Sequence, residues 1–133
     1  MRKHFTTQIL VLGLALSSFT LAQDALWRLQ SDQATSLEIY SNLTPIELNK
    51  IHSWQLVLRG SNGEDITGAN IQVTGGMPLH DHGLPTLPQV SPQADPGRYL
   101  LEGVRFHMPG PWQLLFTVTH GNSTEVFQLD FTL

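Results

Sequence analysis

Residues 51–59 read IHSWQLVLR and carry the clearest strand pattern in the chain. Large side chains at positions 52, 54, 56 and 58 alternate with a mainly polar set at 53, 55, 57 and 59. Successive side chains of a strand point to opposite faces, so this period of two predicts a strand with one buried face. A second run with the same period, from Trp112 to Val118, predicts another such strand near 112–120.

Shorter period-two patterns fill the rest of the chain between clusters of Gly, Pro, Asn and Ser. No segment shows a sustained period of 3.6 residues. The patterns predict an all-β fold, an immunoglobulin-like antiparallel β-sandwich of about seven strands, with a small barrel as the alternative. The Cys…Trp…Cys spacing of true immunoglobulin domains is absent because the chain has no Cys. Further strands are expected near 35–41, 69–74, 98–106 and 126–131.

The first 22 residues have the three-part pattern of a signal peptide. Arg2 and Lys3 precede an apolar run at 9–16, and small residues lead to Ala22. We expect cleavage after Ala22, one domain over 23–133, and a periplasmic or secreted location; an uncleaved N-terminal anchor is the alternative. No other stretch is apolar enough to cross a bilayer, so no membrane span is expected after cleavage.

Charge and the absence of Cys exclude several classes of function. Residues 23–133 contain 5 basic and 11 acidic residues, a net charge of −6, which does not attract nucleic acid or an anionic membrane. Without thiolates, disulfides, blue-copper centres, iron–sulfur clusters and Cys-zinc sites are all excluded. No nucleophile elbow, phosphate-binding loop or H-E-x-x-H motif is present, so the chain is not expected to be an enzyme.

A Pro-rich segment at 77–96 is expected to form a long loop, and long loops in small domains are often functional. It contains His80-Asp81-His82, which in an extended chain would place two imidazoles on one side, about 6–7 Å apart. Asp81 could orient one of these imidazoles. The alternative for an H-x-H in such a loop is a solvated turn without a ligand.

Both methionines of the expected domain lie close to a histidine in sequence. Met77 is three residues before His80, and Met108 follows His107. Imidazole suits copper, zinc, iron and nickel, whereas thioether suits copper(I), so a His/Met site favours copper over zinc.

Met108 and three histidines, His52, His107 and His120, also have structural interpretations. Met108 shares strand parity with Phe106 and is expected to pack in the core. His52 shares the buried face of its strand and fits a hydrogen-bonded histidine at the rim of the sandwich equally well. His107 has the opposite parity to Met108 and is expected to be exposed unless the strand bulges. His120, beside a hairpin turn, is expected at the surface.

A longer pattern extends over roughly residues 35–120. It comprises Ile51–Trp54, Gly68-Ala69, Gly75–Pro78, His80, His82–Thr86, Pro88, Tyr99, Glu102-Gly103, Phe106, Met108, Gly110 and Trp112. This pattern resembles the YtkA-like family of small exported or membrane-anchored proteins, and the resemblance implies a sandwich fold. The family is similar in character to periplasmic copper carriers of the CopC type and to the FixH group, which implies metal handling. The matching positions that could bind a metal are His52, Met77, His80, His82 and Met108, and Pro111 departs from the pattern.

The sequence therefore leads to two main hypotheses. In the first, the protein is an exported copper carrier or chaperone with a His/Met site, which passes the metal ion to a membrane or periplasmic protein. In the second, it is a periplasmic protein-interaction module that acts through the Pro-rich 77–96 loop without metal. An enzyme or a binder of small molecules is the remaining alternative.

Overall fold

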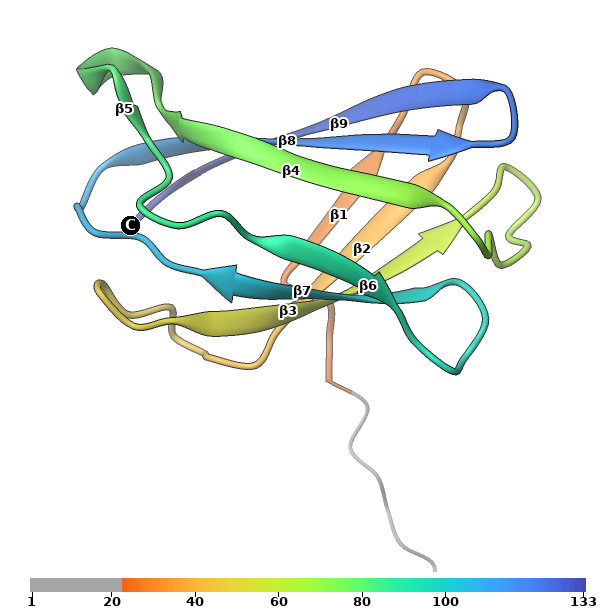
Figure 1. Cartoon of the computed structure of the whole chain (residues 1–133), viewed down its shortest axis with the longest axis horizontal. Coiled ribbons are helices and arrows are strands. Elements are labelled where there is room, and N and C mark those ends of the chain that lie inside the picture. The colour runs from red at the N-terminus through yellow and green to blue at the C-terminus, as the bar shows by residue number, and fades with distance from the viewer. Residues whose placement is uncertain (1–22) are drawn as a thin grey trace, which may run out of the picture.

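The computed structural model describes residues 23–133, so the signal peptide predicted at 1–22 lies outside the described residues. Nine strands in this range form two antiparallel sheets packed face to face, which confirms the predicted all-β sandwich (Figure 1). Within the same range, no helix is long and apolar enough to cross a membrane. The elements are β1 (Trp27–Gln30), β2 (Ser36–Ser41), β3 (His52–Arg59), β4 (Asn70–Met77), η1 (Pro78–His80), β5 (His82–Gly83), β6 (Gln89–Pro92), β7 (Arg98–Val104), β8 (Pro111–His120) and β9 (Ser123–Thr132).

The strand order explains why two runs of sequence carry the strongest patterns. The first sheet has the order β1-β2-β3-β7-β6, and the second has the order β5-β4-β8-β9. Strand β3 lies at the centre of the first sheet, and β8 lies inside the second between β4 and β9. An inner strand has neighbours on both sides, so its inward positions are buried between the sheets; in β3 and β8 these are large apolar side chains, apart from His52 at the start of β3.

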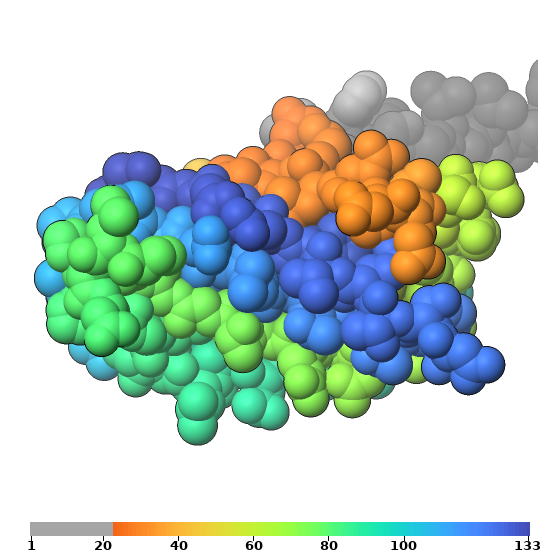
Figure 2. Space-filling model, turned by 90° about the horizontal axis from the view of Figure 1, so that it is seen from above, coloured from red at the N-terminus to blue at the C-terminus, as the bar shows by residue number. Residues whose placement is uncertain are grey.

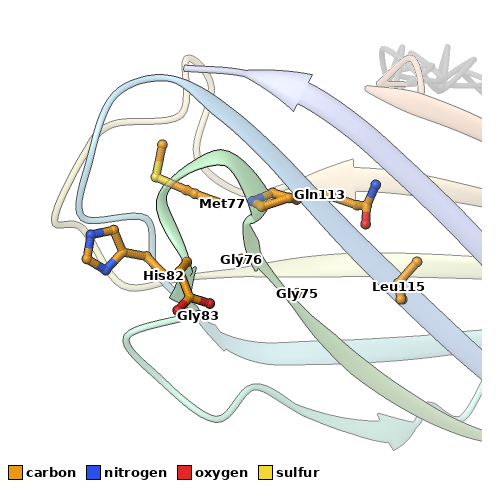
Figure 3. A pocket seen from close by; sticks show the side chains of 9 residues that line it. Gly75, Gly76, Met77, His82, Gly83, Gln113 and Leu115 are labelled. Carbon is orange, nitrogen blue, oxygen red and sulfur yellow. The ribbon is translucent and has the colours of Figure 1, made fainter.

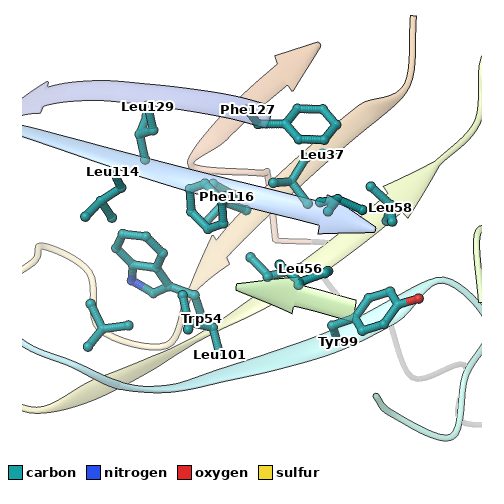
Figure 4. Close-up of a cluster of buried hydrophobic side chains, with 14 of the residues drawn as sticks. Leu37, Trp54, Leu56, Leu58, Tyr99, Leu101, Leu114, Phe116, Phe127 and Leu129 are labelled. Carbon is teal, nitrogen blue, oxygen red and sulfur yellow. The ribbon is translucent and has the colours of Figure 1, made fainter. Parts of the chain in front are cut away.

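The core lies between the two sheets and is built from the inward positions of these strands (Figure 4). Trp54, Leu56 and Leu58 of β3 are fully buried, and so are Trp112 and Phe116 of β8. The predicted alternation on both strands is therefore confirmed. Burying a large apolar side chain contributes about 1.5–3 kcal/mol, so packing can hold the sandwich together without disulfides.

The segment 77–96 is not the irregular loop expected from its prolines. Strand β4 continues to Met77, one 3-10 turn follows, and β5 pairs back onto β4. Farther along, β6 pairs with β7 at the edge of the first sheet. An edge strand tolerates Pro92 because the missing N–H is needed only on a side that has a neighbour.

The sequence pattern does not predict strand β1, because Trp27 and Leu29 give only two apolar positions in four residues. It adds an outer strand to the first sheet through antiparallel pairing with β2.

The η1–β5 segment stands at one end of the sandwich (Figures 1 and 2). It borders the connection between β7 and β8, which crosses from one sheet to the other at that end. The predicted histidine loop and the second His-Met pair of the sequence therefore lie at the same end of the molecule.

Candidate metal centre

A tight hairpin presents the histidine pair. Met77 and His82 are direct partners across the β4–β5 ladder, and Gly76 is the partner of Gly83. The turn between them is a single 3-10 turn that ends at Asp81, whose φ of 52° lies in the left-handed region. A Cβ on Gly76 would lie 2.0 Å from the carbonyl oxygen of His82, so only glycine allows the two backbones to approach this closely.

His80 and His82 are both exposed, and their ring centres lie 6.5 Å apart with 28° between the ring planes. The expectation of an extended tripeptide is wrong, because a turn and a left-handed residue connect the two histidines. The separation nevertheless falls within the expected range of about 6–7 Å. Exposed imidazoles can change rotamer at little cost, so both rings are free to reorient toward an ion.

Met77 lies beneath this pair and is fully buried, with 0% of its side chain exposed. Residues directly opposite in an antiparallel ladder share one face, so Met77 and His82 point to the same side of the hairpin. Figure 3 shows the thioether and the imidazole extending together, away from Gln113 and Leu115. A Cβ placed on Gly110 would lie 2.9 Å from the Met77 methyl group, so the thioether also touches the β7–β8 connection.

The expectation that His107 is exposed is wrong. Strand β7 ends at Val104, so strand parity no longer applies to the connection that follows. His107 is half-buried rather than exposed, and its ring centre lies 6.1 Å from that of His82 and 5.6 Å from that of Trp112. Among the described residues, its buried Nδ1 has no hydrogen-bond partner.

Met108 lies in the same connection and is half-buried against the core, as expected. Its carbonyl oxygen accepts a hydrogen bond of 3.0 Å from Nε1 of Trp112. This bond fixes the β7–β8 connection through the backbone of Met108. A role of its thioether as a ligand stays a prediction.

His52 lies in a different environment from the hairpin histidines. It is buried, with 6% exposed, and its ring packs against Trp54 and Phe106 at 5.9 Å each. Its Nδ1 lies 3.0 Å from the Lys50 carbonyl oxygen, which fits an Nδ1–H donor. Phe106 also contacts Trp112 at 5.0 Å, so aromatic rings separate His52 from His107.

The arrangement is a cluster of potential ligands and not a finished cage. Within residues 23–133, no three His, Asp or Glu side chains converge on one point that could hold a metal ion. A depression of about 320 Å³ adjoins the hairpin, and Gly76, Met77, His82, Gln113 and Leu115 are among its lining residues (Figure 3). Gln113 is the ladder partner of Gly76, so this depression lies on the face of the hairpin opposite to the Met77 and His82 side chains.

The described residues therefore form a small antiparallel β-sandwich domain with a histidine-bearing hairpin at one end. The chain belongs to the YtkA-like family, whose model matches residues 32–117, and this confirms the resemblance seen in the sequence. Among solved structures, the "ZirS C-terminal Domain" is similar with a TM-score of 0.43 and 11% identity, covering 98% of this chain and 84% of that one. No curated protein matches the chain.

Proposed function

We propose that the protein is an exported metal-binding protein that carries copper in the bacterial envelope. The observation that supports this most directly is the pairing of Met77 with His82 across the hairpin, with His80 at 6.5 Å from His82. A thioether and two imidazoles within one turn make a donor set that favours copper over zinc. The signal-peptide pattern at residues 1–22 supports export to a compartment where such a carrier would act.

A carrier fits the exposure of the ligands better than an enzyme does. His80 and His82 face solvent, so a partner protein can approach an ion that they hold and replace them one at a time. An enzyme would instead enclose its substrate in a deep pocket beside the reacting groups, whereas His80 and His82 are exposed. The partner that receives the metal would be another membrane or periplasmic protein.

Metal titration of the purified, chelator-stripped full chain tests the proposal. Copper(I) affinity is measured anaerobically by competition with a chromophoric chelator, and copper(II) affinity by calorimetry. We expect micromolar or tighter binding for the wild type and a loss on the order of tenfold or more for His80→Ala with His82→Ala. His120→Ala is the matched control, because His120 is exposed beside the β8–β9 turn, as predicted. Unchanged binding in the double variant would reject the proposal.

A second function, protein interaction through the 77–96 segment, is favoured by two exposed leucines. Leu79 is 79% exposed and Leu87 is 89% exposed, the two highest values among the large apolar side chains of residues 23–133. In this case, replacing both leucines with Ser would abolish complex formation in the envelope, whereas a chelator would leave it unchanged. Loss of the complex on chelation alone would favour the metal carrier.

A further inference from the structure

We propose that His107 is a metal ligand and that, with Met77 and His82, it forms an inner three-ligand position for copper(I). His80 stays outside this position and acts on the solvent side of His82. The inference rests on the proposed function and goes beyond it, because it assigns the ligand set and the oxidation state. It also adds a residue that lies 25 positions from the hairpin in sequence.

Nδ1 of His107 has no hydrogen-bond partner. Within residues 23–133 this nitrogen is buried, and an unsatisfied buried polar atom is destabilising. Nε2 of His52, Nε1 of Trp54 and Nε of Arg105 are also buried without a partner. Indole and guanidinium nitrogens are hydrogen-bond donors and not metal ligands, and the rings that contact His52 are Trp54 and Phe106. His107 instead lies beside a second histidine, with 6.1 Å between its ring centre and that of His82.

The ring separations also favour His107. A metal–nitrogen bond is about 2.0 Å, so two imidazoles that share one ion have ring centres roughly 5–6 Å apart. The His82–His107 separation of 6.1 Å lies just above this range, and rotation of the exposed His82 side chain can shorten it. The His80–His82 separation of 6.5 Å lies farther above it. Of the two pairs, His82 with His107 needs less movement to share an ion.

The Met77 thioether, the soft donor of the set, lies between the hairpin and the β7–β8 connection. Met77 shares one face of the hairpin with His82, and its methyl group touches Gly110, three residues after His107. The sulfur is therefore enclosed between the hairpin and the connection that carries His107. A buried thioether with two imidazoles is a soft, water-poor donor set, which selects copper(I) over copper(II) and zinc.

Such an ion would cross-link two separate parts of the chain. Met77 and His82 belong to the β4–β5 hairpin of one sheet, and His107 follows β7 of the other sheet. Binding would therefore stabilise the end of the sandwich where the sheets meet. The Trp112 ring, 5.6 Å from that of His107, would report it through a change in fluorescence.

The test compares His107→Gln and His107→Ala with the His120→Ala control. We expect both His107 variants to lose copper(I) affinity on the order of tenfold or more, with copper(II) binding at the exposed pair kept within about threefold. His80→Ala should keep copper(I) affinity within about threefold and lose copper(II) affinity. X-ray absorption of the copper(I) form should show one sulfur and two nitrogen neighbours, with the sulfur lost in Met77→Leu. Circular dichroism of each metal-free variant checks that it is folded, and only folded variants are compared.

The outcomes separate this inference from the proposed function. If the wild type binds copper and both folded His107 variants bind copper(I) equally well, the inference is wrong and the carrier function stands. A copper(I) spectrum without sulfur would also overturn it. If the wild type binds neither oxidation state, the proposed function itself fails, and the inference fails with it.

Discussion

Replacing Gly76 with Ala should open the β4–β5 hairpin and weaken copper binding without unfolding the protein. The added Cβ would lie 2.0 Å from the His82 carbonyl oxygen and 2.9 Å from the Gly83 Cα, and both atoms belong to backbone that cannot move aside cheaply. Strand β5 must therefore separate from β4. Gly83→Ala is a close control, because Gly83 is the direct partner of Gly76 and its added Cβ would come only within 3.9 Å of the Gly75 carbonyl oxygen.

The size of the effect follows from what the hairpin contributes. Opening it disrupts the short ladder and the hydrogen bond from the Leu84 N–H to the Gly75 carbonyl oxygen. At roughly 0.5–1.5 kcal/mol per hydrogen bond, the loss of stability is about 1–2 kcal/mol. That corresponds to a fall in melting temperature of roughly 4–9 °C for a domain of this size. The core between the sheets stays intact, so the variant should remain folded.

Copper(I) affinity should fall as well, because Met77 and His82 then no longer face the same point. We expect a loss on the order of tenfold or more for Gly76→Ala and less than about threefold for Gly83→Ala. Chelator competition measures the affinity, and thermal denaturation followed by circular dichroism measures the stability. Equal affinities and equal melting temperatures for the two variants would refute the link between backbone contact and ligand geometry.

Three further predictions concern the scaffold. Trp54→Ala should cost about 3–5 kcal/mol in urea denaturation, because a fully buried indole is removed from the core. Hydrogen bonds from Tyr40 and two arginines lower the pKa of Glu38 below its ordinary 4.5, so its stabilising effect is complete above that value and lost as the pH falls through the folded-state pKa. Glu38→Gln should therefore flatten the fall in melting temperature on the acid side, measured from about pH 7 to about pH 3. Glu125→Ala removes the acceptor of two hydroxyl groups in the 31–35 turn, so amide hydrogen exchange there should quicken and stability should fall by about 1–3 kcal/mol.

The scaffold was largely predictable because its strands obey a local rule. In β3 and β8, every second side chain faces the core, so the burial of Trp54, Leu56 and Phe116 follows from spacing alone. This alternation cannot be recognised in a strand that buries few side chains. The hairpin strand β5 has two exposed residues, and β6 is an edge strand with a single half-buried position. Neither strand leaves a hydrophobic period in the sequence.

The candidate site was only partly predictable, because it depends on where two distant segments meet. The spacing of Met77, His80 and His82 identified the hairpin side of the site. The position of His107 depends on β7 ending at Val104, which the continuing apolar pattern through Phe106 conceals. The Pro and Gly residues at 109–111 were the available signal, since a turn so close releases His107 from strand parity.

The exposure of the proposed metal ligands links the carrier function to the protein-interaction function. A carrier must hold an ion firmly in transit and still release it on contact with a partner. The buried Met77 and half-buried His107 would provide the hold, while the exposed His80 and His82 offer the route by which a partner's ligands enter. Leu79, exposed in the same turn, lies where the partner would have to dock. An interaction surface at this hairpin is therefore what copper transfer requires, so a complex that depends on Leu79 argues against the carrier only if it forms equally well without metal.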